Sequence, residues 1–188
     1  MQFRLALFLA FSLGVSFAGM AQVFTNLENA LKNPNQVKEL KLKRKRLHEV
    51  PAELAQFKNL EVLNLSHNKI STVPGFLSEL KNLHTIILSN NQLKHFPQSL
   101  SRLDSLKVLI LDRNDIDSIP GAIKAFGSLE SLDLWDNSLT YVDAEIVSLT
   151  KLQYLDLRNT YFKSDDLKWL REAMPWLDLQ STYGCNCD

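Results

Sequence analysis

The chain has 188 residues, of which 45% are hydrophobic and 22% are charged, values typical of a folded soluble protein. Lysine plus arginine and aspartate plus glutamate both number 21, so the global charge gives no argument for binding to nucleic acid. The length suits a single domain.

The first 21 residues have the pattern of a cleavable export signal. Arg4 precedes an apolar run over residues 5–15, and small residues follow over 16–21. The run is short for a spanning helix, which needs about twenty apolar residues. Cleavage would leave Gln22 first and, with Arg4 removed, 20 basic against 21 acidic residues. We therefore expect an exported protein, secreted or periplasmic, with an uncleaved membrane anchor as the alternative.

Residues 22–36 form a predicted helical cap at the N-terminal end. Thr25 and Glu28 have the spacing of a capping box, and Pro34 would end the helix. The apolar face of this short helix would consist of Leu27, Ala30 and Leu31. Such a helix would cover the open end of the core that follows.

From Val37 onward a block recurs every 23 residues, with the core Leu-x-x-Leu-x-Leu-x-x-Asn-x-Leu followed by a hydrophobe and Pro. The blocks are 37–59, 60–82, 83–105, 106–128, 129–151 and 152–175. The Leu-x-Leu alternation predicts a strand whose leucines point inward. One strand cannot bury its apolar face alone, so we expect the strands to stack into a parallel sheet over one continuous core.

The ninth position of four blocks is asparagine. These residues are Asn68, Asn91, Asn114 and Asn137. An inward amide has two donors and an acceptor for the turn backbone where each strand ends. The two terminal blocks have Lys45 and Thr160 instead, and each of these blocks lacks one neighbour. We therefore interpret the asparagines as structural.

The return segments are marked by proline in four blocks. The prolines are Pro51, Pro74, Pro97 and Pro120. Apolar residues three apart follow them, a spacing that permits a helical turn. The fifth block has Asp143 in place of proline. In the sixth, Ser164 is a predicted N-cap for an α-helix over 165–174 that Pro175 ends. The last segment, 176–188, is predicted to cap the core through Trp176, Leu177 and Leu179.

These blocks resemble the leucine-rich repeat family, in its 23-residue type with a hydrophobe-Pro pair. The clearest unit is Leu60-Glu-Val-Leu-Asn-Leu-Ser-His-Asn68-Lys-Ile-Ser-Thr-Val-Pro74, and the resemblance covers residues 37 to about 177. The same type occurs in plant resistance-like and Ras-regulator-like proteins. The resemblance implies an α/β solenoid with a curved parallel sheet, whose concave face binds a partner, usually a protein. It implies no catalytic residue, so we expect no enzyme activity.

The outward positions of the strands and of the turns after them give the predicted contact face. Its residues are Lys43, Arg44, Val62, Ile87, Val108, Ile110, Asp112, Asp133, Trp135, Asp136, Tyr154, Asp156 and Arg158. The repeat places Ile87 beside Ile110, and aromatic and arginine side chains dominate the energetic centres of interfaces. The face is expected to be basic in the first block, apolar in the middle and acidic and aromatic in the last two.

Several other functions are open from the same residues. Trp135 and Tyr154 could bind a glycan, and the basic run 41–46 could bind an anionic polymer. Asp133 and Asp156 stand in adjacent strands, so their carboxylates could lie about 5 Å apart, a separation compatible with a retaining glycosidase pair. An open sheet has no pocket that excludes water, which argues against this reading. The same pair could equally bind a cation or the lysine and arginine side chains of a partner. A structural role in the cell envelope is a further alternative.

The sequence predicts no metal site and no cofactor. The four histidines are His48, His67, His84 and His95, and they occupy four different repeat positions. Cys185 and Cys187 are separated by one residue, a strained spacing for a disulfide, so intermolecular pairing, metal capture and a plain tail are all open. Nucleic acid is not expected as a partner, membrane contact is expected only through the export signal, and the oligomeric state is open.

Overall fold

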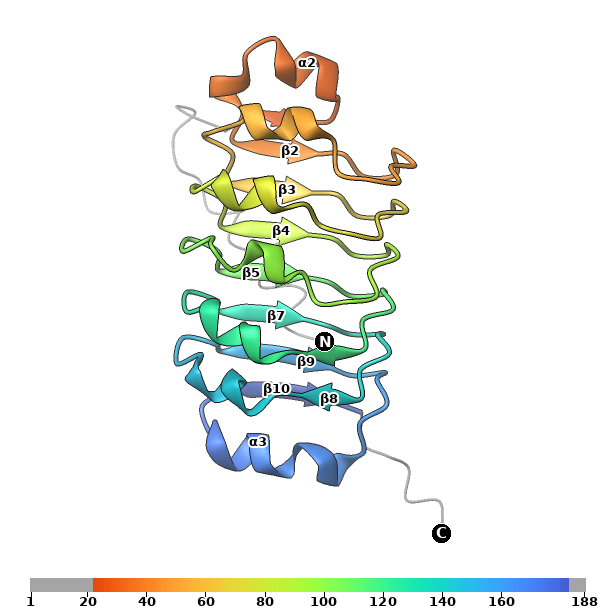
Figure 1. The fold of residues 1–188 in the computed structure, drawn as a ribbon, viewed down its shortest axis with the longest axis vertical. Coiled ribbons are helices and arrows are strands. Elements are labelled where there is room, and N and C mark those ends of the chain that lie inside the picture. The colour runs from red at the N-terminus through yellow and green to blue at the C-terminus, as the bar shows by residue number, and fades with distance from the viewer. Residues whose placement is uncertain (1–21, 183–188) are drawn as a thin grey trace, which may run out of the picture.

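The structure is a computed structural model that describes residues 22–182. Its main sheet has eight parallel strands stacked in chain order along the long axis (Figure 1). They are β1 (Val23–Phe24), β2 (Glu39–Lys41), β3 (Val62–Asn64), β4 (Thr85–Ile87), β5 (Val108–Ile110), β7 (Ser131–Asp133), β9 (Tyr154–Leu157) and β10 (Asp178–Ser181). The predicted export signal and the two cysteines lie outside the described residues.

Strand pairing follows the 23-residue period. Leu40 of β2 is the partner of Leu63, Leu63 is the partner of Ile86, and the same step continues to β9. These central residues are fully buried, while the residues on either side of them face the opposite surface and are partly exposed from β2 to β7. The leucine-rich-repeat architecture predicted from the block pattern is therefore confirmed.

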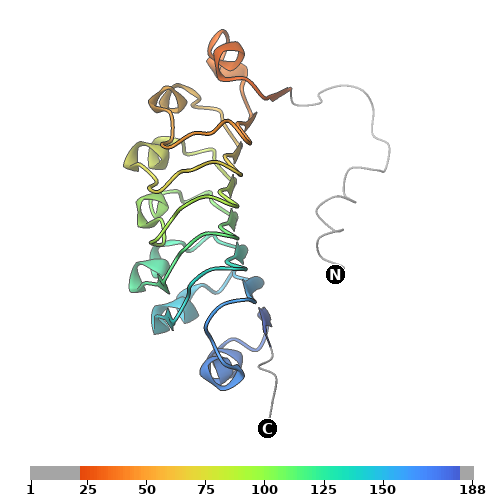
Figure 2. The ribbon, with the colours of Figure 1, turned by 90° about the vertical axis from the view of Figure 1, so that its right-hand side faces the viewer.

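The return segments are 3-10 turns that lie on the convex side, with the sheet on the concave side (Figure 2). They are Ala52–Gln56, Gly75–Glu79, Gln98–Leu100, Gly121–Ala125 and Ala144–Ser148. Proline precedes the first four, and Asp143 precedes the fifth. The Asp143 carboxylate accepts a hydrogen bond from Glu145 N at 3.0 Å, which explains why this block needs no proline. A second sheet, β6 (Ser118–Ile119) with β8 (Tyr141–Val142), was not predicted.

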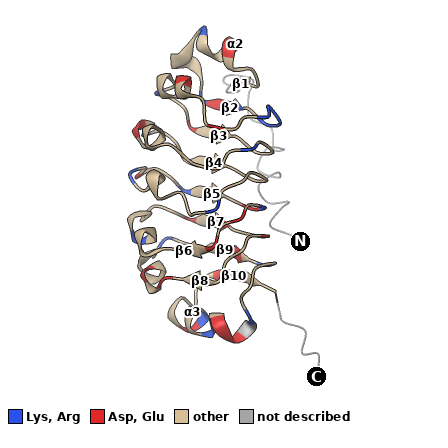
Figure 3. Cartoon of the chain, turned by 45° about the vertical axis from the view of Figure 1, so that its right-hand side comes forward, with Lys and Arg blue, Asp and Glu red and all other residues tan. Residues whose placement is uncertain are grey.

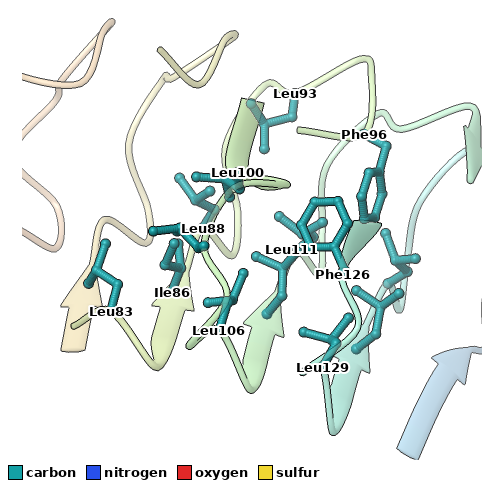
Figure 4. Packing of buried hydrophobic residues seen from close by; sticks show 14 of the residues in the cluster. Leu83, Ile86, Leu88, Leu93, Phe96, Leu100, Leu106, Leu111, Phe126 and Leu129 are labelled. Carbon is teal, nitrogen blue, oxygen red and sulfur yellow. The ribbon is translucent and has the colours of Figure 1, made fainter. Parts of the chain in front are cut away.

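The core lies between the sheet and these turns, and Figure 4 shows part of it. Leucine and isoleucine side chains from successive blocks fill it as one cluster. Phe96 and Phe126 pack edge to face, with ring centroids 5.5 Å apart. Because each block buries its apolar side chains only against its neighbours, stability depends on stacking.

The N-terminal cap is a helix, although its start differs from the prediction. Helix α2 (Leu27–Leu31) is followed by a 3-10 turn, Pro34–Gln36. Asn26, not Thr25, is the N-cap, and its side-chain oxygen accepts from Asn29 N at 3.0 Å. Strand β1 precedes the helix and pairs with β2. Because β1 has two residues, it is too short to be predicted from the sequence.

The C-terminal cap also departs from the prediction. The segment expected as one α-helix over 165–174 is a 3-10 turn, Ser164–Leu167, followed by α3 (Lys168–Ala173). Lys163 is the N-cap residue, and its N–H donates to the Asp166 carboxylate at 2.7 Å. Strand β10 buries Leu179, but Trp176 is 50% exposed and covers little of the core. Within residues 22–182, no helix has the length and apolarity needed to cross a bilayer.

Candidate partner-binding face

The ninth-position amides hold the turns at the ends of the strands. Asn91 Nδ2 donates to Leu65 O at 3.1 Å and to Leu88 O at 2.9 Å, while its Oδ1 accepts from Ile70 N at 3.0 Å. The same pattern of donors and acceptors recurs at Asn68, Asn114 and Asn137. Each side-chain amide thus forms hydrogen bonds with the backbone of its own block and of the preceding one. These bonds stabilise the turns, so the amides are not available to a ligand.

The eighth position of every block has a left-handed backbone. The residues, with φ between 53° and 59°, are Arg44, His67, Asn90, Arg113, Asp136 and Asn159. Their conformation turns the chain sharply where the strand ends. The turns stack along one side of the sheet, which we call the turn edge, made of residues 43–46, 66–69, 89–92, 112–115, 135–138 and 158–161.

The centre of the concave face is apolar. Ile87 and Ile110 are direct partners in neighbouring strands, as predicted, and both are half-buried. Val62 and Val108 lie on the same face, but Thr85 stands between them in the strand pairing, so the two valines do not form a continuous apolar row. The contiguous apolar surface is therefore smaller than the residue pattern alone predicts, and it is centred on the two isoleucines.

Trp135 is held at the turn edge by its neighbours. The Arg113 guanidinium lies over the Trp135 ring, 4.5 Å from its centroid. Arg113 Nε is 4.0 Å from the Asp136 carboxylate, and Asn159 donates to the same carboxylate. Arg113 and Asn159 stand at the outward eighth position of their blocks, but they are not in the set of residues predicted to bind a partner. The repeat contained the signal, because position 8 of each block stacks beside positions 7 and 8 of the next.

The predicted acidic pair is not two free carboxylates. Asp133 and Asp156 are partners in adjacent strands, but Asp156 is only 1% exposed. It accepts hydrogen bonds from Tyr154 Oη at 3.0 Å, from Arg158 N at 3.0 Å and from the Arg158 guanidinium at 2.5 Å. Asp133 accepts from Trp135 N at 3.0 Å. Both side chains thus close the turn two residues on, an arrangement that Asn64 repeats with Ser66 N.

This cluster shifts the acidity of its members. Burial and the Asp156 carboxylate raise the pKa of the Tyr154 phenol, so it stays protonated well beyond neutral pH. The hydrogen bonds to Asp156 raise the pKa of Arg158, which fixes its positive charge. A carboxylate saturated by a permanent cation and a phenol does not suit proton transfer, so Asp156 is a weak candidate for acid-base catalysis.

The two ends of the turn edge differ in charge, as Figure 3 shows. Lys43 and Arg44 are exposed in the turn after β2. Burial, together with Lys43, Arg44 and Arg113, lowers the pKa of His67 in the next block. Asp112, predicted as a contact residue, is only 8% exposed, so its side chain offers little surface to a partner.

A polar hollow of about 470 Å³ opens on the turn edge in the later blocks. It is lined by Arg113, Asp136, Asn159 and Tyr161, together with three of the ladder asparagines, Asn91, Asn114 and Asn137. Tyr161 is 71% exposed. Sequence reasoning missed this hollow, because Tyr161 stands at a turn position outside the strand. Among residues 22–182, no group of three or more His, Cys, Asp and Glu side chains could hold a metal ion.

Comparison with known proteins agrees with this architecture. A leucine-rich-repeat protein of Leptospira interrogans superposes with a TM-score of 0.70 at 26% identity, over 87% of this chain and 48% of that one. An internalin of Listeria monocytogenes superposes with a TM-score of 0.61 at 18% identity, over 88% and 55%. The receptor in a TLR13–ssRNA13 complex gives 0.66 at 24% identity, over 78% and 22%. The chain thus spans about half the length of the first two proteins.

At the level of sequence, no curated protein matches the chain. The leucine rich repeat family profile does match, over residues 35–93, 74–116 and 107–162. These segments overlap and cover well over half of the 188 residues. Proteins of this fold are typically binding scaffolds without catalytic activity. The chain belongs to the leucine-rich repeat family.

Proposed function

We propose that this chain is an exported, non-enzymatic protein that captures a protein partner on its concave sheet. The observation that carries the proposal is the contact between Ile87 and Ile110 in neighbouring strands, flanked at the turn edge by the Arg113–Trp135 pair. Half-buried aliphatic side chains next to an ordered aromatic ring have the composition of an interface centre.

The surroundings of this centre support a protein rather than a small apolar ligand. The face is open, and charged side chains border it at both ends: Lys43 and Arg44 in the first block, Asp133, Asp136 and Arg158 in the later ones. Charges at the rim of an interface set orientation and association rate more than affinity. The sheet is preorganised by its continuous strand pairing, so little ordering is needed on binding.

The test is affinity capture from the native extracellular or envelope fraction, with the wild-type chain compared with an Ile110→Ala/Trp135→Ala variant. A partner retained by the wild type and lost by the variant is expected. The matched control is Tyr141→Ala/Val147→Ala, which removes an aromatic and an aliphatic side chain that are 54% and 38% exposed outside the eight-stranded sheet. Equal retention by all three chains would contradict the assignment.

The proposal of export is supported by Arg4, the apolar run 5–15 and the small residues that follow, and it is tested separately. The N-terminal sequence of protein recovered from outside the cytoplasm is expected to begin at Gln22. Recovery of the intact N-terminus from a membrane fraction would instead support an uncleaved anchor.

Glycan recognition is the second candidate, and the polar hollow favours it. A hollow of about 470 Å³ has the size of a small-ligand site, and Tyr161 offers an aromatic ring beside the hydrogen-bonding side chains of Asp136 and Asn159. A glycan array would show a specific sugar whose binding is lost in Tyr161→Ala. An array without hits, combined with a captured protein partner, would leave the protein-binding function.

A further inference from the structure

The charge of the turn edge falls from the first block to the fourth and is +1 again in the sixth, where Arg158 is the charged residue. Positions 7 to 10 carry four cations in the first block, one lysine in the second, none in the third and a net charge of −1 in the fourth and fifth. In the sixth, Arg158 is paired with Asp156. The four cations of the first block are Lys43, Arg44, Lys45 and Arg46, and all are exposed. With Lys69 they form what we call the basic turn.

Structure alone does not require a cation at position 9 of the first block. In later blocks the asparagine there accepts from the turn of the preceding block, as Asn68 Oδ1 does from Lys45 N at 2.9 Å and from Leu47 N at 3.1 Å. The first block follows no turn of this kind, so its ninth position is released from that role. A neutral polar residue would serve there, yet Lys45 adds a charge to three like charges and raises their mutual repulsion.

The basic turn is rigid and its charges are available. Asn68 Oδ1 accepts a hydrogen bond from Lys45 N and so fixes the backbone of this turn, and Arg44 N donates to Ser66 O at 3.1 Å. Lys69 N donates to Leu47 O at 2.7 Å, which holds the second block against the first. Within the described chain, the ion pairs of lysine and arginine involve other residues, and none includes the cations of residues 43–46. Repulsion that the fold maintains is relieved when an anion binds.

We propose that the basic turn binds a linear acidic polysaccharide through its sulfate or carboxylate groups, independently of the concave face. The turn contains no aromatic ring on which bases of a single-stranded nucleic acid could stack. None of the large hydrophobic side chains exposed in the described chain lies in it, so it has no group to insert into a bilayer. A nucleic-acid duplex would cover several turns of the edge, and the acidic turns in the later blocks would repel its phosphates.

The probe is heparin, with binding to the purified chain measured by calorimetry over a series of salt concentrations. Wild-type affinity is expected to fall with salt, because association releases counterions. Lys43→Glu/Lys45→Glu is expected to weaken binding by about tenfold or more and to melt at the same or a higher temperature without heparin. The milder Lys43→Gln/Lys45→Gln gives the same readout if charge reversal disturbs folding.

The matched control is Lys58→Glu/Lys151→Glu, which makes the same change in net charge at two exposed lysines away from the turn edge. Its heparin affinity is expected to stay within about twofold of wild type. Equal losses in the two variants would show attraction by net charge alone and would overturn the proposal. Tighter binding to duplex DNA, or to vesicles containing phosphatidylglycerol, than to heparin would overturn the polysaccharide assignment.

His67 provides a local readout by NMR titration. Burial lowers the pKa of His67, and Lys43, Arg44 and Arg113 lower it further, while Asp112 acts in the opposite sense. Polysaccharide bound at the basic turn is expected to neutralise these cations and move the His67 pKa upward. Heparin binding that leaves the His67 titration unchanged would place the polymer elsewhere and would contradict the proposal.

Discussion

The Arg113 guanidinium lies over the Trp135 indole, 4.5 Å from the ring centroid, and joins two consecutive repeats. A cation above an indole contributes about 0.5–2 kcal/mol, depending on exposure. The contact limits the rotamers of Trp135, so a partner bound as we propose would meet a ring that is already oriented.

Replacing Arg113 by alanine is therefore expected to weaken partner binding and increase the mobility of Trp135. We expect a loss in affinity of about threefold to thirtyfold, with little change in thermal stability. Time-resolved tryptophan anisotropy measures the mobility and calorimetry the affinity. Arg102→Ala, at an exposed site outside the sheet, serves as the control. A Trp135 that is as immobile in Arg113→Ala as in wild type would refute the orienting role.

Asn91→Ala is expected to destabilise the solenoid strongly. The change leaves two carbonyls and the Ile70 N–H without their side-chain partner, and each buried polar group left unsatisfied costs about 1–3 kcal/mol. Urea unfolding measures the loss. Asn82→Ala, which removes an exposed amide bonded to Lys58 O, should change stability by less than about 0.5 kcal/mol. Similar values for both variants would invalidate the structural reading of the ladder.

The Asp156–Arg158 pair predicts an order of stability between two variants. Arg158→Met leaves a carboxylate that is 1% exposed without its cation, at a cost of about 3 kcal/mol or more. Asp156→Asn leaves Arg158, whose side chain is 45% exposed and remains hydrated, so the expected cost is about 1 kcal/mol. Denaturant unfolding of both chains checks the order. The reverse order would mean that Asp156 is more hydrated than the structure shows.

Tyr154 should make stability depend on alkaline pH. Its folded pKa is raised above the unfolded value of about 10, because burial and Asp156 disfavour the phenolate. The contribution of Tyr154 is therefore fully present below about pH 10 and is lost as pH rises from there toward the folded pKa. Unfolding free energies measured on either side of pH 10 should show this fall, and Tyr154→Phe should show less of it. Identical profiles for the two chains would exclude Tyr154 as the cause.

The repeat predicted most of the fold because each leucine position has only one environment that buries it. The register of Ile87 with Ile110, the ladder amides and the inward leucines all follow from a 23-residue spacing. The caps were less predictable. At the start of α2, Thr25 and Asn26 are both good capping residues, so the sequence did not decide between them, and the structure has Asn26 as the N-cap.

The candidate site was predicted in part. Spacing identified which residues share the concave face, but not how far each side chain is covered, so Asp112 and Asp156 were expected to be more exposed than they are. Side-chain pairing across blocks was also beyond the sequence pattern. Whether Arg113 lies over Trp135 or extends into solvent depends on rotamers that no spacing rule specifies.

The constant strand register has an evolutionary consequence. If recombination between two misaligned copies removed residues 85–107, Val108 would stand opposite Val62 and Leu109 opposite Leu63, so the inward leucine row would be preserved, while Ile110 would lose its partner Ile87. Loss or duplication of one block therefore shortens or extends the concave face while the strand pairing and the core keep the same pattern. Natural variants that differ by whole blocks would be foldable from the start, and selection could act on their partners directly.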